Sequence, residues 1–112
     1  MKQLEFKLIT NNETVIDEKS NYFIKENILN FKAKEELYTF DLENNLLTKK
    51  NDESIIKINL KDKLVEITLL PQNLTFDMEI IDFKIENKEN NIKLEYTFEN
   101  DEQTTNCIII NY

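Results

Sequence analysis

The chain has 112 residues and a net charge of −8, with 40% hydrophobic and 32% charged residues. This length fits one domain, and the balance of apolar and charged residues is that of a folded chain and excludes a disordered one. Because the excess negative charge repels nucleic acid and anionic lipid, we predict no nucleic-acid partner and no membrane partner.

Apolar and polar residues alternate along most of the chain, which is the period-two pattern of half-buried strands. The pattern begins at Leu4, Phe6 and Leu8. Further strands are expected, in chain order, at residues 14–18, 22–25, 28–32, 37–42, 46–47, 56–60, 65–69, 74–85, 92–98 and 104–111. At most one short helical turn is expected, at residues 33–37, where the composition favours helix.

The turns must form without glycine, because the chain contains none. Its sixteen Asn residues include many at the expected turns. Asn tolerates the left-handed backbone region better than most non-glycine residues, so we predict that Asn replaces Gly there. The doubled apolar pair Ile80-Ile81 breaks the alternation within one long strand, which predicts a bulge or a sharp bend.

Many short strands joined by short turns favour antiparallel neighbours in a meander. A meander of this length tends to close on itself, since open edges invite aggregation. We therefore predict an all-β fold: a single antiparallel meander barrel of eight to ten strands, forming one domain over residues 1–112. The inward side chains are mostly Leu, Ile, Phe and Tyr, and their size predicts a mostly filled interior.

Cys107 is the only cysteine, and the chain has no His. Lacking a base beside it and lying in an apolar strand, its thiol is expected to fill space and to stay inert. No intrachain disulfide can form, which suits a reducing compartment. Residues 1–7 alternate at once and contain no apolar run of signal-peptide type, so we expect a cytoplasmic protein.

The acidic turns at residues 51–53 and 99–102 lack the glycine-containing loop of calcium-binding motifs and are interpreted as solvated turns. Nearly all carboxylates lie on the outward phase of their strands. Asp82 is the exception, beside the break in phase, and a bend explains its position better than catalysis does. Five lysines within residues 49–63 form a local positive patch, which we interpret as solvated because the chain is acidic overall.

Tyr38 and Tyr96 lie on apolar strand faces and are expected in the core or at its rim, with their hydroxyls reaching water. No His or Cys pair is present to bind a metal, and no glycine loop can hold a phosphate. We therefore predict no catalytic residue, no cofactor and no metal site, and we do not expect an enzyme.

Alternating runs at residues 74–80, 83–85, 92–98 and 106–110 follow one another in the C-terminal half, and residues 22–31 form an early hairpin. These runs resemble the closing strands and the early hairpin of the YwiB-like bacterial proteins, which are small cytosolic β-barrels of the calycin, or lipocalin-like, type. The likeness covers about half of the chain and is one of strand alternation. This chain differs in having no glycine and in its turn at residues 70–73, where the family tends to carry Pro and Gly. The family has no established function, so the resemblance implies a fold and no site residue.

Three functions stay open from the sequence. The first is a non-catalytic binding module for a small apolar ligand at one mouth of the barrel, which the resemblance to calycins favours. The second is a protein-interaction module, either a homodimer or an acidic protein that binds a basic partner. The terminal strand around Ile108-Ile109-Ile110 favours this function. It has apolar residues on both faces, so the face that does not enter the core is expected to be covered by another protein surface. The third is an enzyme, which nothing in the sequence favours.

Overall fold

Ten β-strands form the regular structure of the chain in the computed structural model, which describes residues 2–112. In chain order they are β1 Gln3–Thr10, β2 Glu13–Lys25, β3 Ile28–Ala33, β4 Glu36–Asp41, β5 Leu46–Lys50, β6 Ser54–Asn59, β7 Leu64–Leu69, β8 Leu74–Lys88, β9 Asn91–Phe98 and β10 Asn106–Asn111. No helix is present among these residues.

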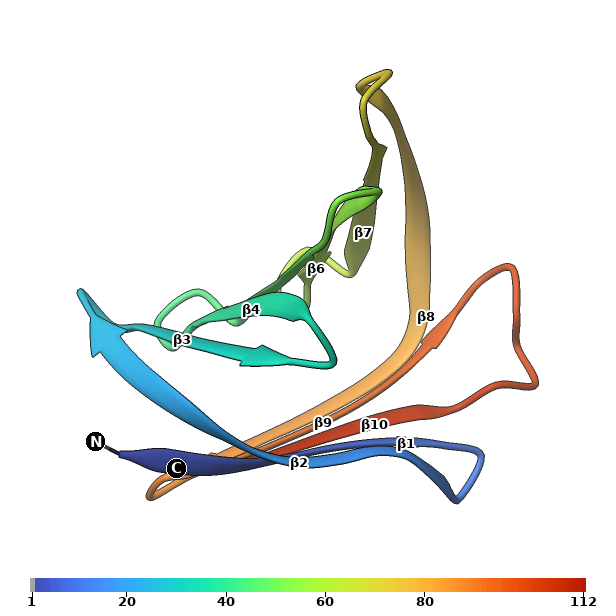
Figure 1. Cartoon of the computed structure of the whole chain (residues 1–112). Coiled ribbons are helices and arrows are strands. Elements are labelled where there is room, and N and C mark those ends of the chain that lie inside the picture. Colours follow the sequence, from blue (N-terminus) through green and yellow to red (C-terminus); the bar gives the residue numbers. More distant parts are fainter. Residues whose placement is uncertain (1) are drawn as a thin grey trace.

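The strands close into a barrel of simple meander order. Each strand pairs antiparallel with the next along the chain, and β1 also pairs with β10, which completes the ring. Figure 1 shows β1, β9 and β10 crossing one side of the molecule while β7 and the first part of β8 rise away from them. The predicted antiparallel meander barrel is confirmed.

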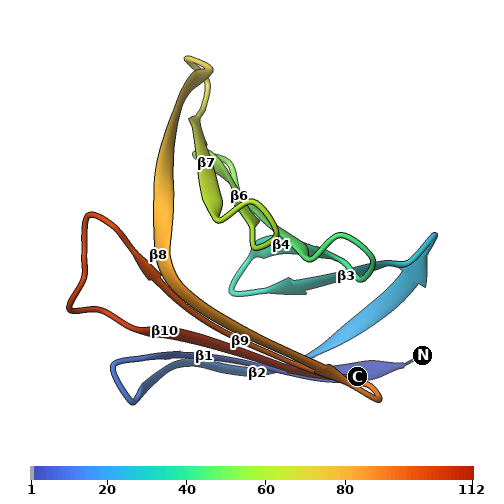
Figure 2. The same ribbon diagram turned by 180° about the vertical axis from the view of Figure 1, so that it is seen from behind.

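Two long strands turn the corners between the two sides of the barrel. Residues 13–21 of β2 pair with β1, whereas residues 22–25 pair with β3. Residues 74–79 of β8 pair with β7, whereas residues 80–88 pair with β9, and the bend of β8 is visible from both sides in Figures 1 and 2. The register shifts between Ile80 and Asp82, which confirms the predicted bulge. The sequence pattern had divided β2 into two strands, but the structure joins them into one.

The turns use left-handed residues in place of glycine, as predicted. Ten non-glycine residues have positive φ, and six of them are asparagines: Asn11, Asn12, Asn27, Asn45, Asn73 and Asn90. The helical turn favoured at residues 33–37 does not form. Instead Lys34 (φ 51°) and Glu35 (φ 62°) make a tight hairpin turn, because Ala33 and Glu36 on either side pair as the last rung of β3 and β4. So short a segment cannot nucleate a helix against this strand pairing.

Aromatic rings fill the centre of the barrel. The ring of Phe6 lies with its centroid 5.2 Å from that of Phe31 and 4.8 Å from that of Tyr38, and Phe31 stacks on Tyr38 at 5.1 Å. All three side chains are buried, and Phe6 has no exposed area. Rings at these separations gain packing and quadrupole contacts beyond the burial of area alone. These three rings link β1 to β3 and β4 across the interior.

Replacing Phe6 should therefore be costly. We expect Phe6→Ala to lower the free energy of unfolding by about 3–5 kcal/mol, because it opens a cavity among rings that cannot collapse. Phe23→Ala is the matched control, since Phe23 lies on the outer face of β2 with 61% of its surface exposed, and it should change stability by only about 0.5 kcal/mol. Urea unfolding curves of both variants measure the difference. Equal losses would contradict the central position of Phe6.

Candidate functional site

A cavity of about 210 Å³ lies inside the barrel, next to the aromatic cluster. Its walls come from the ends of strands that meet at one mouth: Leu8 near the end of β1, Ile56 near the start of β6, Ile67 near the end of β7 and Ile108 in β10. The turns β1–β2, β3–β4, β5–β6, β7–β8 and β9–β10 all belong to this end, which we call the open mouth. Most of the lining is aliphatic or aromatic, as in small-molecule sites.

The apolar lining continues past the cavity onto the rim of the open mouth. Val65, Ile67 and Leu69 alternate along β7 and share its inner face, and across the ladder Ile67 pairs with Phe76 and Leu69 pairs with Leu74. Leu69, Phe76 and Leu74 nevertheless expose 39%, 47% and 59% of their surfaces. Because β9 pairs with β8 only from Ile80 onward, the opposite side of the barrel does not reach far enough to cover them.

One member of an ion pair, Lys49, lines the cavity. Lys49 places its Nζ 3.2 Å from Oε2 of Glu36. The same Glu36 oxygen accepts a hydrogen bond from Asn51 Nδ2 at 3.1 Å. A partly hydrated pair of this kind adds at most about 1 kcal/mol to stability. The main effect of the ion pair is therefore on the position of Lys49, because Glu36 holds the flexible lysine side chain against the cavity.

Two carboxylates thus depart from the outward phase that the sequence analysis assigned to nearly all of them. Glu36 is in phase with the buried Tyr38, and Glu18 lies opposite the buried Phe6. Glu18 accepts a hydrogen bond from the backbone N–H of Lys34 at 3.1 Å. Asp82, which the sequence marks as the exception to the outward phase, is exposed just beyond the bulge. Lys49 also differs from its prediction. The sequence predicts that it belongs to a solvated lysine patch, whereas in the structure it lines the cavity.

Two tyrosines face the cavity from opposite sides of the barrel. Tyr38 on β4 and Tyr96 on β9 both line it, and both side chains are almost fully buried. Burial raises the pKa of Tyr96 to about 12. Burial raises the pKa of Tyr38 as well, with smaller contributions from Glu36, Tyr96 and Glu18. Both phenols consequently keep their protons at neutral pH and can donate hydrogen bonds.

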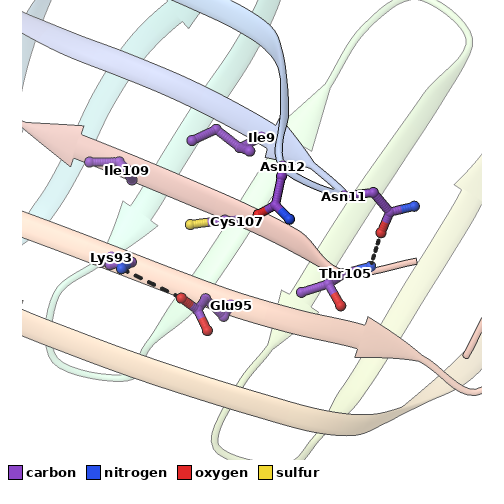
Figure 3. Close-up of a pocket in the computed structure, with 8 residues that line it drawn as sticks. All are labelled: Ile9, Asn11, Asn12, Lys93, Glu95, Thr105, Cys107 and Ile109. Atoms are coloured by element: carbon purple, nitrogen blue, oxygen red, sulfur yellow. Dashed lines mark hydrogen bonds and ion pairs between the residues drawn. The ribbon is translucent and has the colours of Figure 1, made fainter. Parts of the chain in front are cut away.

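A second hollow, of about 480 Å³, lies on the outer face of β1, β10 and β9 (Figure 3). Its apolar part consists of Ile9, Cys107 and Ile109. Beside them Lys93 and Glu95 form an ion pair, with 3.5 Å between Nζ of Lys93 and Oε1 of Glu95. Cys107 is half-buried there and does not enter the core. Partial burial, reinforced by Glu95, raises the pKa of its thiol, which disfavours the reactive thiolate.

Within residues 2–112, no group of three or more His, Cys, Asp or Glu side chains is placed to hold a metal ion. The same part of the chain contains no helix with the length and apolar character needed to cross a bilayer.

No known protein-family model matches the chain, and no curated protein matches it in sequence. The cavity is therefore the feature of this chain from which a function can be inferred.

The buried phenol of Tyr96 should make the protein sensitive to alkali. Its pKa is raised from 10.0 to about 12 in the folded state, so its contribution to stability is complete below pH 10 and is lost as the pH rises toward 12. Two pKa units correspond to a loss of roughly 2–3 kcal/mol. Urea unfolding of the unmodified protein and of Tyr96→Phe between pH 9 and pH 12 measures this loss. We expect a steeper fall in the unmodified protein, and parallel curves would contradict the assignment.

Proposed function

We propose that this chain is a cytoplasmic, non-catalytic binding module that takes one small apolar ligand into the cavity at the open mouth of the barrel. The observation that supports this function is an apolar cavity of about 210 Å³ whose rim carries large exposed apolar side chains. A barrel with a filled interior would lack such a cavity. The resemblance to calycins, which remains a prediction, agrees with this use of the barrel.

The size of the cavity restricts the ligand. An engineered apolar cavity of about 150 Å³ stays dry and takes up benzene. At about 210 Å³, the cavity in this barrel accommodates a single ring with a short substituent or a branched aliphatic molecule of similar volume. A long acyl chain exceeds this volume, so its remainder would have to lie along the exposed rim formed by Leu69, Leu74 and Phe76.

Binding should be detectable by native mass spectrometry of freshly purified protein and by thermal shift with graded apolar compounds. We expect either a retained mass or a rise in the melting temperature with single-ring compounds, because they fill the cavity without displacing side chains. Ile67→Trp should abolish the rise by occupying the cavity. Leu64→Trp is the matched control, since Leu64 lies on the outer face of the same strand and exposes 42% of its surface.

Should Ile67→Trp fail to fold, Ile56→Phe offers a smaller filling change, because Ile56 is the cross-strand neighbour of Ile67 at the same cavity. The proposal is contradicted if the purified protein retains no mass and no apolar compound raises its melting temperature. It is also contradicted if the filled variants bind as well as the unmodified protein.

The outer hollow supports a second candidate function, self-association. The sequence left open which face of the terminal strand needs a cover. Ile108 and Ile110 are buried in the core, whereas Ile109 points outward beside Ile9. In a two-fold arrangement the same patch meets itself, so Lys93 of one copy can face Glu95 of the other, on either side of the apolar contact.

If the protein self-associates through this face, a charge introduced at Ile109 should separate the two copies. We expect the unmodified protein to run as a dimer in light scattering and Ile109→Lys to run as a monomer, because a buried lysine would lack a partner in the interface. Leu37→Lys is the control, since Leu37 is equally an outward apolar residue of a strand, with 47% of its surface exposed, and lies on β4. A monomeric unmodified protein would rule this function out.

A further inference from the structure

The polar residues of the cavity form two cross-strand pairs that face each other. On one side Tyr38 of β4 pairs with Lys49 of β5, and on the other Tyr96 of β9 pairs with Asn106 of β10. All four residues line the same cavity. Each side of the barrel therefore contributes one phenol and one nitrogen-bearing side chain to an otherwise apolar wall.

Every free hydrogen-bonding group of these pairs can donate, and two of the four side chains can only donate. Asn106 uses its Oδ1 to accept a hydrogen bond from Thr10 Oγ1 at 3.2 Å, which leaves its amide nitrogen as the free end. The two phenols keep their protons, as their burial requires, and an ammonium group has donors alone. A ligand that satisfies this wall must consequently present an acceptor, since a purely apolar ligand would leave the donors without a partner.

The charges around the cavity argue against an ionised ligand. Lys49 is already balanced by Glu36, so the pair offers no net positive charge to a carboxylate. Glu18 lies near enough to Tyr38 to raise its pKa, which adds negative charge on the same side. A cation would find acceptors only in the two phenol oxygens, because Lys49 and the free amide nitrogen of Asn106 can only donate. Transfer of either ion into such a site costs more than transfer of a neutral molecule.

We propose that the ligand is a small uncharged molecule, a single ring with a short substituent, whose carbonyl-type oxygen accepts hydrogen bonds from Tyr38 and Tyr96. This inference rests on the proposed binding function and specifies the chemistry of its ligand. The ring occupies the apolar part between Ile56, Ile67 and Ile108, and the acceptor lies where the two cross-strand pairs meet.

Four probes of nearly equal shape test separately whether the ligand needs an acceptor and whether it must be uncharged. They are acetophenone, ethylbenzene, benzoate and protonated 1-phenylethylamine. Titration of the purified full-length protein, followed by calorimetry or by chemical shifts, gives the four affinities. We expect acetophenone to bind about ten times more tightly than ethylbenzene, which corresponds to one or two hydrogen bonds. Benzoate and the ammonium probe are expected to bind more weakly than ethylbenzene.

Phenol deletions test the role of the hydroxyls. Tyr96→Phe and Tyr38→Phe should each reduce the preference for acetophenone over ethylbenzene severalfold. Tyr22→Phe is the matched control, because Tyr22 packs edge-on against Tyr112 at 5.8 Å, away from the cavity lining. If one deletion unfolds the barrel, the other still provides the comparison.

The outcomes distinguish this inference from the function on which it rests. If ethylbenzene binds as tightly as acetophenone, or benzoate binds best, the neutral-acceptor inference is overturned while the binding function stands. If the two phenol variants keep the full preference, the hydroxyls are not the donors and the inference is again overturned. If none of the four probes binds, the inference is overturned, whereas the proposed function fails only if native mass spectrometry and the thermal shifts with other apolar compounds are negative as well.

Discussion

The architecture depends on two strands that each belong to both sides of the barrel. β2 passes from β1 to β3, and β8 passes from β7 to β9, so each strand bends between its two partners. These two bends bring the chain round until β1 meets β10. Closure provides an interior and gives every strand two neighbours, so unpaired edges, which invite aggregation, are confined mainly to the corner segments of β2 and β8. The alternation of apolar and polar residues has a structural meaning only because this interior exists.

Closure in turn depends on tight turns that the chain makes without glycine. Left-handed backbone is costly for residues with a Cβ atom, and Asn bears that cost best. At three hairpins, however, left-handed positions fall to Glu26, to the pair Lys34-Glu35 and to Lys63. Strand pairing on both sides fixes these turns, since Lys25 pairs with Ile28 just as Ala33 pairs with Glu36. The ladders therefore over-determine backbone conformations that the local sequence disfavours.

Much of the fold could be predicted because period two is a local signal. The alternation identified the strands, and the doubled Ile80-Ile81 identified the bend of β8. The bend of β2 was missed because its corner contains the polar run Lys19-Ser20-Asn21, which reads as a break between strands. The inner face at that corner carries Glu18 and Ser20, whose hydroxyl bonds to the backbone oxygen of Lys32. A strand that bends here exposes its inner face, so polar residues are tolerated where the pattern predicts apolar ones.

The cavity was less predictable, because its volume depends on how far the two sides of the barrel diverge, and no local pattern encodes that distance. A partial signal existed in the phase of single residues. Glu36 shares a face with Tyr38 and Phe40, and Lys49 shares one with Leu47, which places both charges inward once the register is known. Composition obscured this signal, since Glu36 lay in a helix-forming stretch and Lys49 in a run of lysines.

The distribution of polarity in the interior supports a role for the cavity beyond packing. Within residues 2–112, Thr97 is the one buried residue with a polar aliphatic side chain, and it lies on the outward phase of β9, whereas the inward charges gather at the open mouth. Apolar residues at positions 36 and 49 would have continued the alternation of β4 and β5 and extended the filled core. Instead, both strands break their pattern near the same cavity, with Lys49 opposite Tyr38 and Glu36 two residues before Tyr38 on the same face. Such local departures from the rule that builds the rest of a fold are expected where a site, and not stability, determines the residue.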